Sequence, residues 1–234
     1  MSQRVFIQGA KKASPIVLGY VPIGLAFGVM AVQQGLTILE IFLMSLLVYA
    51  GSSQFIAAGM IAAQASVGGI IATTFLVNLR HLLMSASLST YLKGVSPLLQ
   101  SVISFGITDE TFAVGITEVK KGSQESSFFL GLHFTSQLAW IISTVLGGVL
   151  GNLIPNPDKL GLNYALPAMF IGLLLMQMNN RQELLVALFS GALSIGLLTL
   201  LDGNLNIILA TIIGATVGVV MEGWKKKSSL SLSE

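Results

Sequence analysis

Apolar residues along this chain gather in long runs that are separated by short polar links. The runs lie near 14–33, 38–62, 66–90, 97–117, 128–151, 163–179, 184–201 and 204–221. A helix needs about 20 apolar residues to cross the roughly 30 Å hydrocarbon core of a bilayer, and several runs reach that length. The pattern therefore predicts an all-α fold, a polytopic bundle of about eight transmembrane helices.

The composition also indicates a membrane protein. Of the 234 residues, 53% are hydrophobic and 9% are charged, and the mean hydropathy is +0.83; a soluble domain is roughly 25% charged. The net charge of +2 is small and the basic residues form short clusters, which argues against a nucleic-acid partner. Without cysteine, disulfides and thiolate chemistry are excluded. No linker is visible, so we expect residues 1–234 to form one transmembrane domain.

Basic residues flank the apolar runs and predict the orientation of the chain. With eight spans, one side of the membrane carries Lys11, Lys12, Lys120, Lys121, Arg181 and Lys225 to Lys227. Because cytoplasmic loops are enriched in Lys and Arg, we expect both termini in the cytoplasm. Lys93 and Lys159 fall on the opposite side. Seven spans with one re-entrant segment are therefore the alternative.

Two parts of the chain resemble each other at an offset of 115 residues. Tyr49-Ala50 followed by Phe55-Ile56 matches Tyr164-Ala165 followed by Phe170-Ile171. Each pair follows a helix with two glycines four positions apart, Gly24 and Gly28 or Gly147 and Gly151, a spacing that favours close helix packing. Because many transporters contain such repeats, we expect two related halves, near 14–117 and 128–221.

Small and polar residues interrupt the second run at Tyr49-Ala-Gly-Ser-Ser-Gln54. Pro167 occupies the corresponding place in the second half and removes a backbone donor from a helix. Interrupted helices at matching positions of two halves indicate a transporter site, because the freed amides and carbonyls bind ionic groups. We expect the amides around Ser52 to Gln54 to bind a carboxylate. The alternative is that Gly51 and the serines only allow close packing.

Charged residues lie inside two other runs. Asn78-Leu-Arg-His81 is flanked by apolar residues, and Asp109 and Glu110 lie within 97–117. An arginine at the centre of a membrane helix costs about 2.5–3.5 kcal/mol, so Arg80 should face a partner or water. Pairing with Asp109 would leave His81 and Glu110 to relay protons. The ion-coupling residues are then expected to be Asn78, Arg80, His81, Asp109 and Glu110; alternatively, the pair locks two helices together or Arg80 reaches the membrane surface.

These patterns predict a substrate site for a small zwitterion. Asp109 or Glu110 would bind its ammonium, while Phe55 and Phe112 would contact an apolar side chain. His133 and Gln137, one turn apart, could line a cavity, although a lone histidine there is more often a packing residue. No enzyme motif or metal-ligand cluster is recognisable, so we expect no catalysis and no cofactor. The expected binding residues are Tyr49, Gly51, Ser52, Ser53, Gln54, Phe55, Asp109, Glu110, Phe112 and Pro167.

The first half resembles a known family at four motifs. These are Pro22-Ile-Gly-Leu-Ala-Phe-Gly28, Tyr49-Ala-Gly-Ser-Ser-Gln-Phe55, Asn78-Leu-Arg-His81 and Thr108-Asp-Glu-Thr-Phe112. They resemble the AzlC family, the large subunit of bacterial branched-chain amino acid exporters; the second half is similar mainly in hydropathy and length. The resemblance implies export of valine, leucine, isoleucine and also methionine across the bacterial inner membrane. The short inward loops favour a secondary transporter, driven by an ion or by the membrane potential. It also implies a small AzlD-like membrane subunit as partner.

Other functions fit the same composition. The chain could be a permease subunit for another small solute, but its short inward loops offer no recognisable coupling segment for an ATPase. A channel would conduct without saturation. An intramembrane enzyme would need a paired acid and base, and a purely structural subunit would transport nothing by itself.

Overall fold

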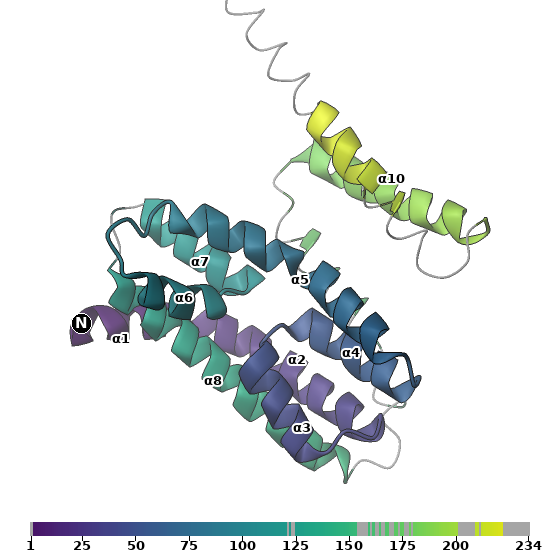
Figure 1. Ribbon diagram of the computed structural model, residues 1–234, viewed down its shortest axis with the longest axis horizontal. Coiled ribbons are helices and arrows are strands. Elements are labelled where there is room, and N and C mark those ends of the chain that lie inside the picture. The colour runs from purple at the N-terminus through teal and green to yellow at the C-terminus, as the bar shows by residue number, and fades with distance from the viewer. Residues whose placement is uncertain are drawn as a thin grey trace, which may run out of the picture. The chain divides into compact units, whose positions relative to one another are not determined.

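The computed structural model describes residues 2–120, 122, 125–153, 159, 161, 164, 167–168, 171–172, 174–175, 178, 180–200, 209–210 and 212–221. The regular elements in these ranges are all helices, which confirms the predicted all-α fold (Figure 1). The chain divides into two compact units, Met1–Phe170 and Ile171–Glu234.

Three helices pack together in the larger unit. α1 (Gln3–Lys12) and α2 (Ser14–Gln33) both pack lengthwise on α8 (Ser126–Gly151) (Figure 1). The contact is close because glycines lie on both surfaces. A side chain at Gly28 would overlap the Thr144 carbonyl, and one at Gly147 would overlap the Leu25 carbonyl. The glycines noted in the sequence thus lie in the α2–α8 interface.

Glycines also bring α1 against α8. A side chain at Gly9 would overlap the Phe128 carbonyl, and one at Gly131 would overlap the Phe6 carbonyl. The backbones of α1 and α8 are therefore in contact at these two glycines. The sequence pattern did not predict α1.

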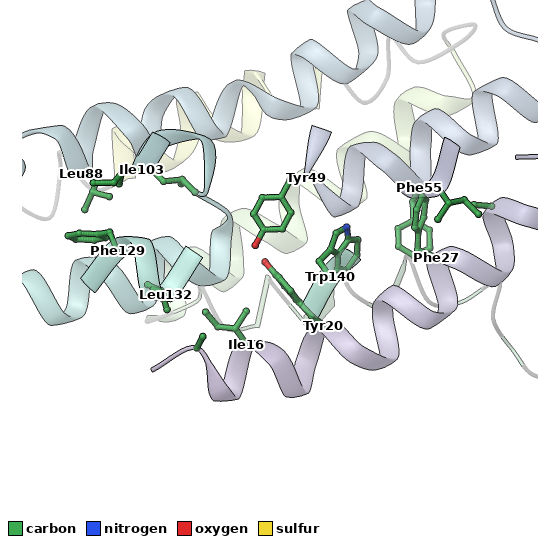
Figure 2. Packing of buried hydrophobic residues seen from close by; sticks show 14 of the residues in the cluster. Ile16, Tyr20, Phe27, Tyr49, Phe55, Leu88, Ile103, Phe129, Leu132 and Trp140 are labelled. Carbon is green, nitrogen blue, oxygen red and sulfur yellow. The ribbon is translucent and has the colours of Figure 1, made fainter. Parts of the chain in front are cut away.

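Aromatic rings fill the core between these helices and their neighbours. Phe27 meets Phe55 edge-on with ring centroids 5.1 Å apart, and Tyr20 meets Trp140 edge-on at 5.2 Å (Figure 2). Such edge-to-face pairs contribute about 0.5–1.5 kcal/mol beyond the area they bury. They hold α2 against both α8 and the helix that carries Phe55.

The second predicted span is broken near its middle, as expected. It begins as α3 (Ile38–Leu43), where Thr37 and Glu40 form a capping box, and continues as the π-helix η1 (Met44–Val48). Tyr49 then takes a left-handed conformation with φ of 45° and ψ of 47°, and α4 starts anew (Gly51–Ala62). A left-handed residue other than glycine costs about 1–2 kcal/mol and ends a regular helix.

The next span is a continuous helix, α5 (Val67–Ser89), close to the predicted 66–90. The prediction of one helix over 97–117 was wrong, because the structure has α6 (Pro97–Phe105) and α7 (Asp109–Lys120). Side chains take over the backbone bonds at the break. The Thr111 hydroxyl donates to the Gly106 carbonyl at 3.0 Å and accepts from the Thr108 N–H at 2.8 Å. Threonines that bond locally in this way compete with helix continuation.

The smaller unit contains α10 (Arg181–Leu198) and an apolar helix, Ile212–Met221. Asn180 caps α10 by accepting from the N–H groups of Gln182 and Glu183. Most of the expected span 163–179 lies outside the described residues. Among the described residues, α2, α5, α8 and α10 are long and apolar enough to cross a membrane. The span number and the repeat remain predictions.

Candidate functional site

Arg80 links the two broken helices. Its guanidinium donates from Nη2 to the Ser52 hydroxyl in the first turn of α4, and its Nη1 pairs with Asp109 Oδ2 in the first turn of α7 at 2.8 Å. The Arg80–Asp109 pair expected from the sequence is therefore present. The cation reaches out from α5 to the starts of two other helices.

Asn78 makes a second connection between α5 and the first break. Its side-chain amide donates to Ser53 Oγ at 3.1 Å, and Ser53 Oγ donates to the Ala50 carbonyl at 2.9 Å. The two serines are buried. Their hydroxyls thus fix the position of α4 relative to α5.

Tyr20 makes the corresponding contact with the second break. Its hydroxyl is 2.7 Å from Thr108 Oγ1 and donates to Glu110 Oε2 at 2.9 Å. The sequence pattern did not indicate this contact of Tyr20. Nothing in the apolar run around Tyr20 distinguishes it from an interfacial tyrosine, because its partners come from a distant part of the chain.

Several buried polar atoms at this place have no partner in the described part of the protein. They are Tyr49 Oη, Asn78 Oδ1 and Arg80 Nε. The Tyr49 hydroxyl points toward that of Tyr20 (Figure 2), and α4 begins without a side-chain cap. Uncapped first-turn N–H groups and unpaired buried atoms need a ligand or water. Positive and negative groups of this kind, side by side, suit a small zwitterion.

Gln54 belongs to a buried network instead of an open site. Its amide donates to Ser45 Oγ at 3.2 Å and accepts from Trp140 Nε1 at 3.0 Å, while its backbone N–H donates to the Ala50 carbonyl at 2.9 Å. A side chain at Gly51 would lie 3.0 Å from the Trp140 ring. Gly51 thus lies in close contact with α8 through the Trp140 ring, and the binding roles expected of Gly51 and Gln54 stay predictions.

One further side chain supports the first break. Gln137, on α8, donates to the Leu46 carbonyl in η1 at 3.0 Å. A carbonyl near an interrupted helix end loses its usual intrahelical partner, so this bond replaces it. Gln137 therefore stabilises the break.

The remaining predicted residues are distributed around the site. Phe55 packs on Phe27, and Phe112 is half-buried against the core. His81 is half-buried next to Arg80 and lies within electrostatic range of Glu110. Pro167 is exposed, and most of its neighbours lie outside the described residues. Within the described ranges, no three His, Asp or Glu side chains gather so as to hold a metal ion.

Comparison with known proteins places these residues in a family. The model of the family described as AzlC protein matches residues 15–154, which run from α2 to α8. The chain belongs to the AzlC family. The match contains all the broken-helix contacts made by Tyr20, Arg80 and Asp109. The protein is thus a membrane transport protein of the AzlC family.

Relatives of the AzlC-family chain cover most of its length. The inner membrane protein YgaZ of Escherichia coli is 31% identical over 94% of this chain and 92% of its own length. The branched-chain amino acid transport protein AzlC of Bacillus subtilis is 28% identical over 88% of this chain and 80% of its own. An uncharacterized membrane protein of Archaeoglobus fulgidus is 34% identical over 94% of this chain. No solved structure matches.

Proposed function

We propose that this chain is the large subunit of an ion-coupled transporter that exports branched-chain amino acids across the bacterial inner membrane. A small AzlD-like membrane protein would be its partner, and both termini of the chain would lie in the cytoplasm. The name of the Bacillus relative supports the substrate class. The observation that carries the proposal is Arg80, which lies between Ser52 and Asp109 at two helix breaks.

The amino acid would bind between these opposite charges. Its carboxylate would accept from Arg80 and from the first-turn N–H groups of α4 near Ser52 and Ser53, where the helix dipole is positive. Its ammonium would pair with Asp109 or Glu110. Entry of a zwitterion would replace one ion pair by two, so each protein charge would keep a partner.

The apolar side chain of the substrate would extend away from the charges. Phe112 lies one turn after Asp109 on α7 and is half-buried, so it is the aromatic residue that we expect to contact a branched side chain. Phe55 would contribute through its packing on Phe27. The ion-coupling group would comprise Asn78, Arg80, His81, Asp109 and Glu110, with His81 and Glu110 exchanging protons with water.

A transport assay in proteoliposomes tests this function. Vesicles would contain the purified chain with or without a coexpressed AzlD-like subunit, and labelled leucine, valine or lysine would be added under an imposed proton gradient. We expect saturable leucine and valine flux that requires the small subunit and ignores lysine. Flux without saturation would indicate a channel, and a requirement for ATP would indicate an ATP-driven permease. Absence of all flux in sealed vesicles would refute the amino acid assignment.

A further inference from the structure

His133 is a buried histidine of α8 whose ring nitrogens have no hydrogen-bond partner. The residue is 5% exposed, and both Nδ1 and Nε2 lack a bonded acceptor or donor in the described part of the chain. A neutral imidazole carries one donor and one acceptor, and leaving them unpaired in a core is unfavourable. An apolar residue would fill the same space without this penalty.

The surroundings of the ring point to the second helix break. A side chain at Gly106 would overlap His133, so the imidazole lies directly against the residue where α6 ends. The Ile103 carbonyl, in the last turn of α6, faces the ring within interaction range. On the other side, the Phe129 ring lies 6.0 Å away between centroids.

A protonated ring would find acceptors here. The last carbonyls of a helix carry the negative end of its dipole and favour a cation. The Ile103 carbonyl accepts from the Gly106 N–H at 3.1 Å and has a second lone pair for another donor. An imidazolium has two N–H donors for such carbonyls. A proton gained by the ring would therefore find an acceptor at the end of α6, whereas the neutral ring stays unsatisfied.

α6 and the rest of α8 carry no charged side chain. The elements packed on α8 do carry titratable groups, but in the described ranges none makes a hydrogen bond or ion pair with His133. These groups are Arg4, Lys11 and Lys12 in α1, Tyr20 in α2, Glu40 in α3, and Asp109, Glu110, Glu118 and Lys120 in α7.

We propose that His133 is a proton-binding site of this transporter and that its protonation repositions the start of α7 through Gly106. The residues that follow Gly106 include Thr108, which bonds Tyr20, and Asp109, which pairs with Arg80. A ring that binds the end of α6 would move this short connection. Proton binding at His133 and amino acid binding at Asp109 are thereby linked, and the linkage rests on the proposed function.

The chain has two histidines, so comparison with His81→Gln identifies the His133 signals in the spectrum of the unaltered chain. In the unaltered chain, with ¹⁵N-labelled histidine in lipid nanodiscs, the His133 nitrogens should titrate between about pH 3 and pH 8. Leucine should shift the midpoint and lysine should not, because linkage is reciprocal. A ring that stays neutral over this whole range, or that ignores leucine, would overturn the proposal. The readout needs no flux, so failure of the transport function would be detected separately.

Transport measurements provide a second test. His133→Gln should retain leucine counterflow at constant pH but lose at least about half of the change in rate between pH 6 and pH 8. Ser136→Ala is the matched control, because Ser136 is buried on the same helix and donates only to the Leu132 carbonyl. It should keep the normal pH profile. An unchanged profile in His133→Gln would overturn the proposal, and poor membrane insertion of that variant would leave the decision to the titration.

Discussion

Arg80 on α5 and Asp109 on α7 form an ion pair of 2.8 Å whose side chains are 31% and 15% exposed. The pair is thus neither a solvated surface bridge nor a fully dry core pair. A surface pair contributes about 0–1 kcal/mol, whereas removing one partner of a buried pair costs about 3–5 kcal/mol. Because both side chains are partly exposed, a small solute can reach them. Because they are also partly buried, each charge still needs the other as its partner.

Neutralising one partner should therefore impair transport. Arg80→Gln or Asp109→Asn leaves a half-buried charge unpaired and removes one contact to the substrate, so we expect leucine counterflow to fall by about tenfold or more. Lys12→Gln is the control, because Lys12 pairs with Glu118 at 3.0 Å while being 51% exposed. It should change the rate less than twofold or so.

The double variant Arg80→Gln/Asp109→Asn separates folding from binding. When both charges are removed, no unpaired charge remains in the protein. The amount of protein in the membrane should therefore recover, while transport stays low. Recovery of full counterflow in the double variant would show that the pair only locks two helices together.

Tyr20→Phe should weaken the contact between α2 and the start of α7. The change removes the hydroxyl that bonds Thr108 and Glu110 while keeping the ring against Trp140. Loss of these bonds should destabilise the protein by about 1–3 kcal/mol and raise the KM for leucine. Tyr91→Phe is the comparison, since Tyr91 is 47% exposed. Equal thermal unfolding and equal KM for the two variants would contradict the role of Tyr20.

Gly28→Ala should separate α2 from α8. The added methyl group would overlap the Thr144 carbonyl and the backbone of Gly147 and Gly148, so the helices must move apart. Overpacking of this kind costs about 1–3 kcal/mol. Gly19→Ala on the same helix meets no atom within 4 Å. Thermal denaturation in detergent should show a lower Tm only for Gly28→Ala.

Gln64→Gly should stabilise the protein. Gln64 has φ of 52°, a left-handed conformation that costs a residue with a Cβ atom about 1–2 kcal/mol and that glycine adopts freely. Its side chain is exposed. We expect an increase of about 0.5–1 kcal/mol in the free energy of unfolding. The neighbouring Ala63→Gly, at φ of −78°, should not stabilise; a gain there instead would refute the strain at Gln64.

Features set by hydrophobicity and charge could be predicted from the sequence. α2 occupies 14–33 as expected and α5 lies within one residue of the expected ends, because apolar length determines both. Arg80 was expected to find Asp109, since an unpaired charge in an apolar run is costly. The break at Tyr49 followed from small polar residues inside an apolar segment.

Features that depend on side-chain hydrogen bonds were missed. The second break comes after the apolar residues Ile103 and Phe105. It is produced by hydrogen bonds of the Thr108 and Thr111 hydroxyls, which a hydropathy pattern does not reveal. Tyr20 was missed because its role depends on residues in α7. The roles of the site residues in transport stay predictions.

The touching backbones at Gly9 and Gly131 have a consequence for biosynthesis. α1 leaves the ribosome well before α8, so its partner surface does not yet exist when it emerges. Its basic residues Arg4, Lys11 and Lys12 can meanwhile rest on anionic lipid headgroups. Final docking of α1 must then await insertion of α8, so this contact is a late step in the assembly of the chain.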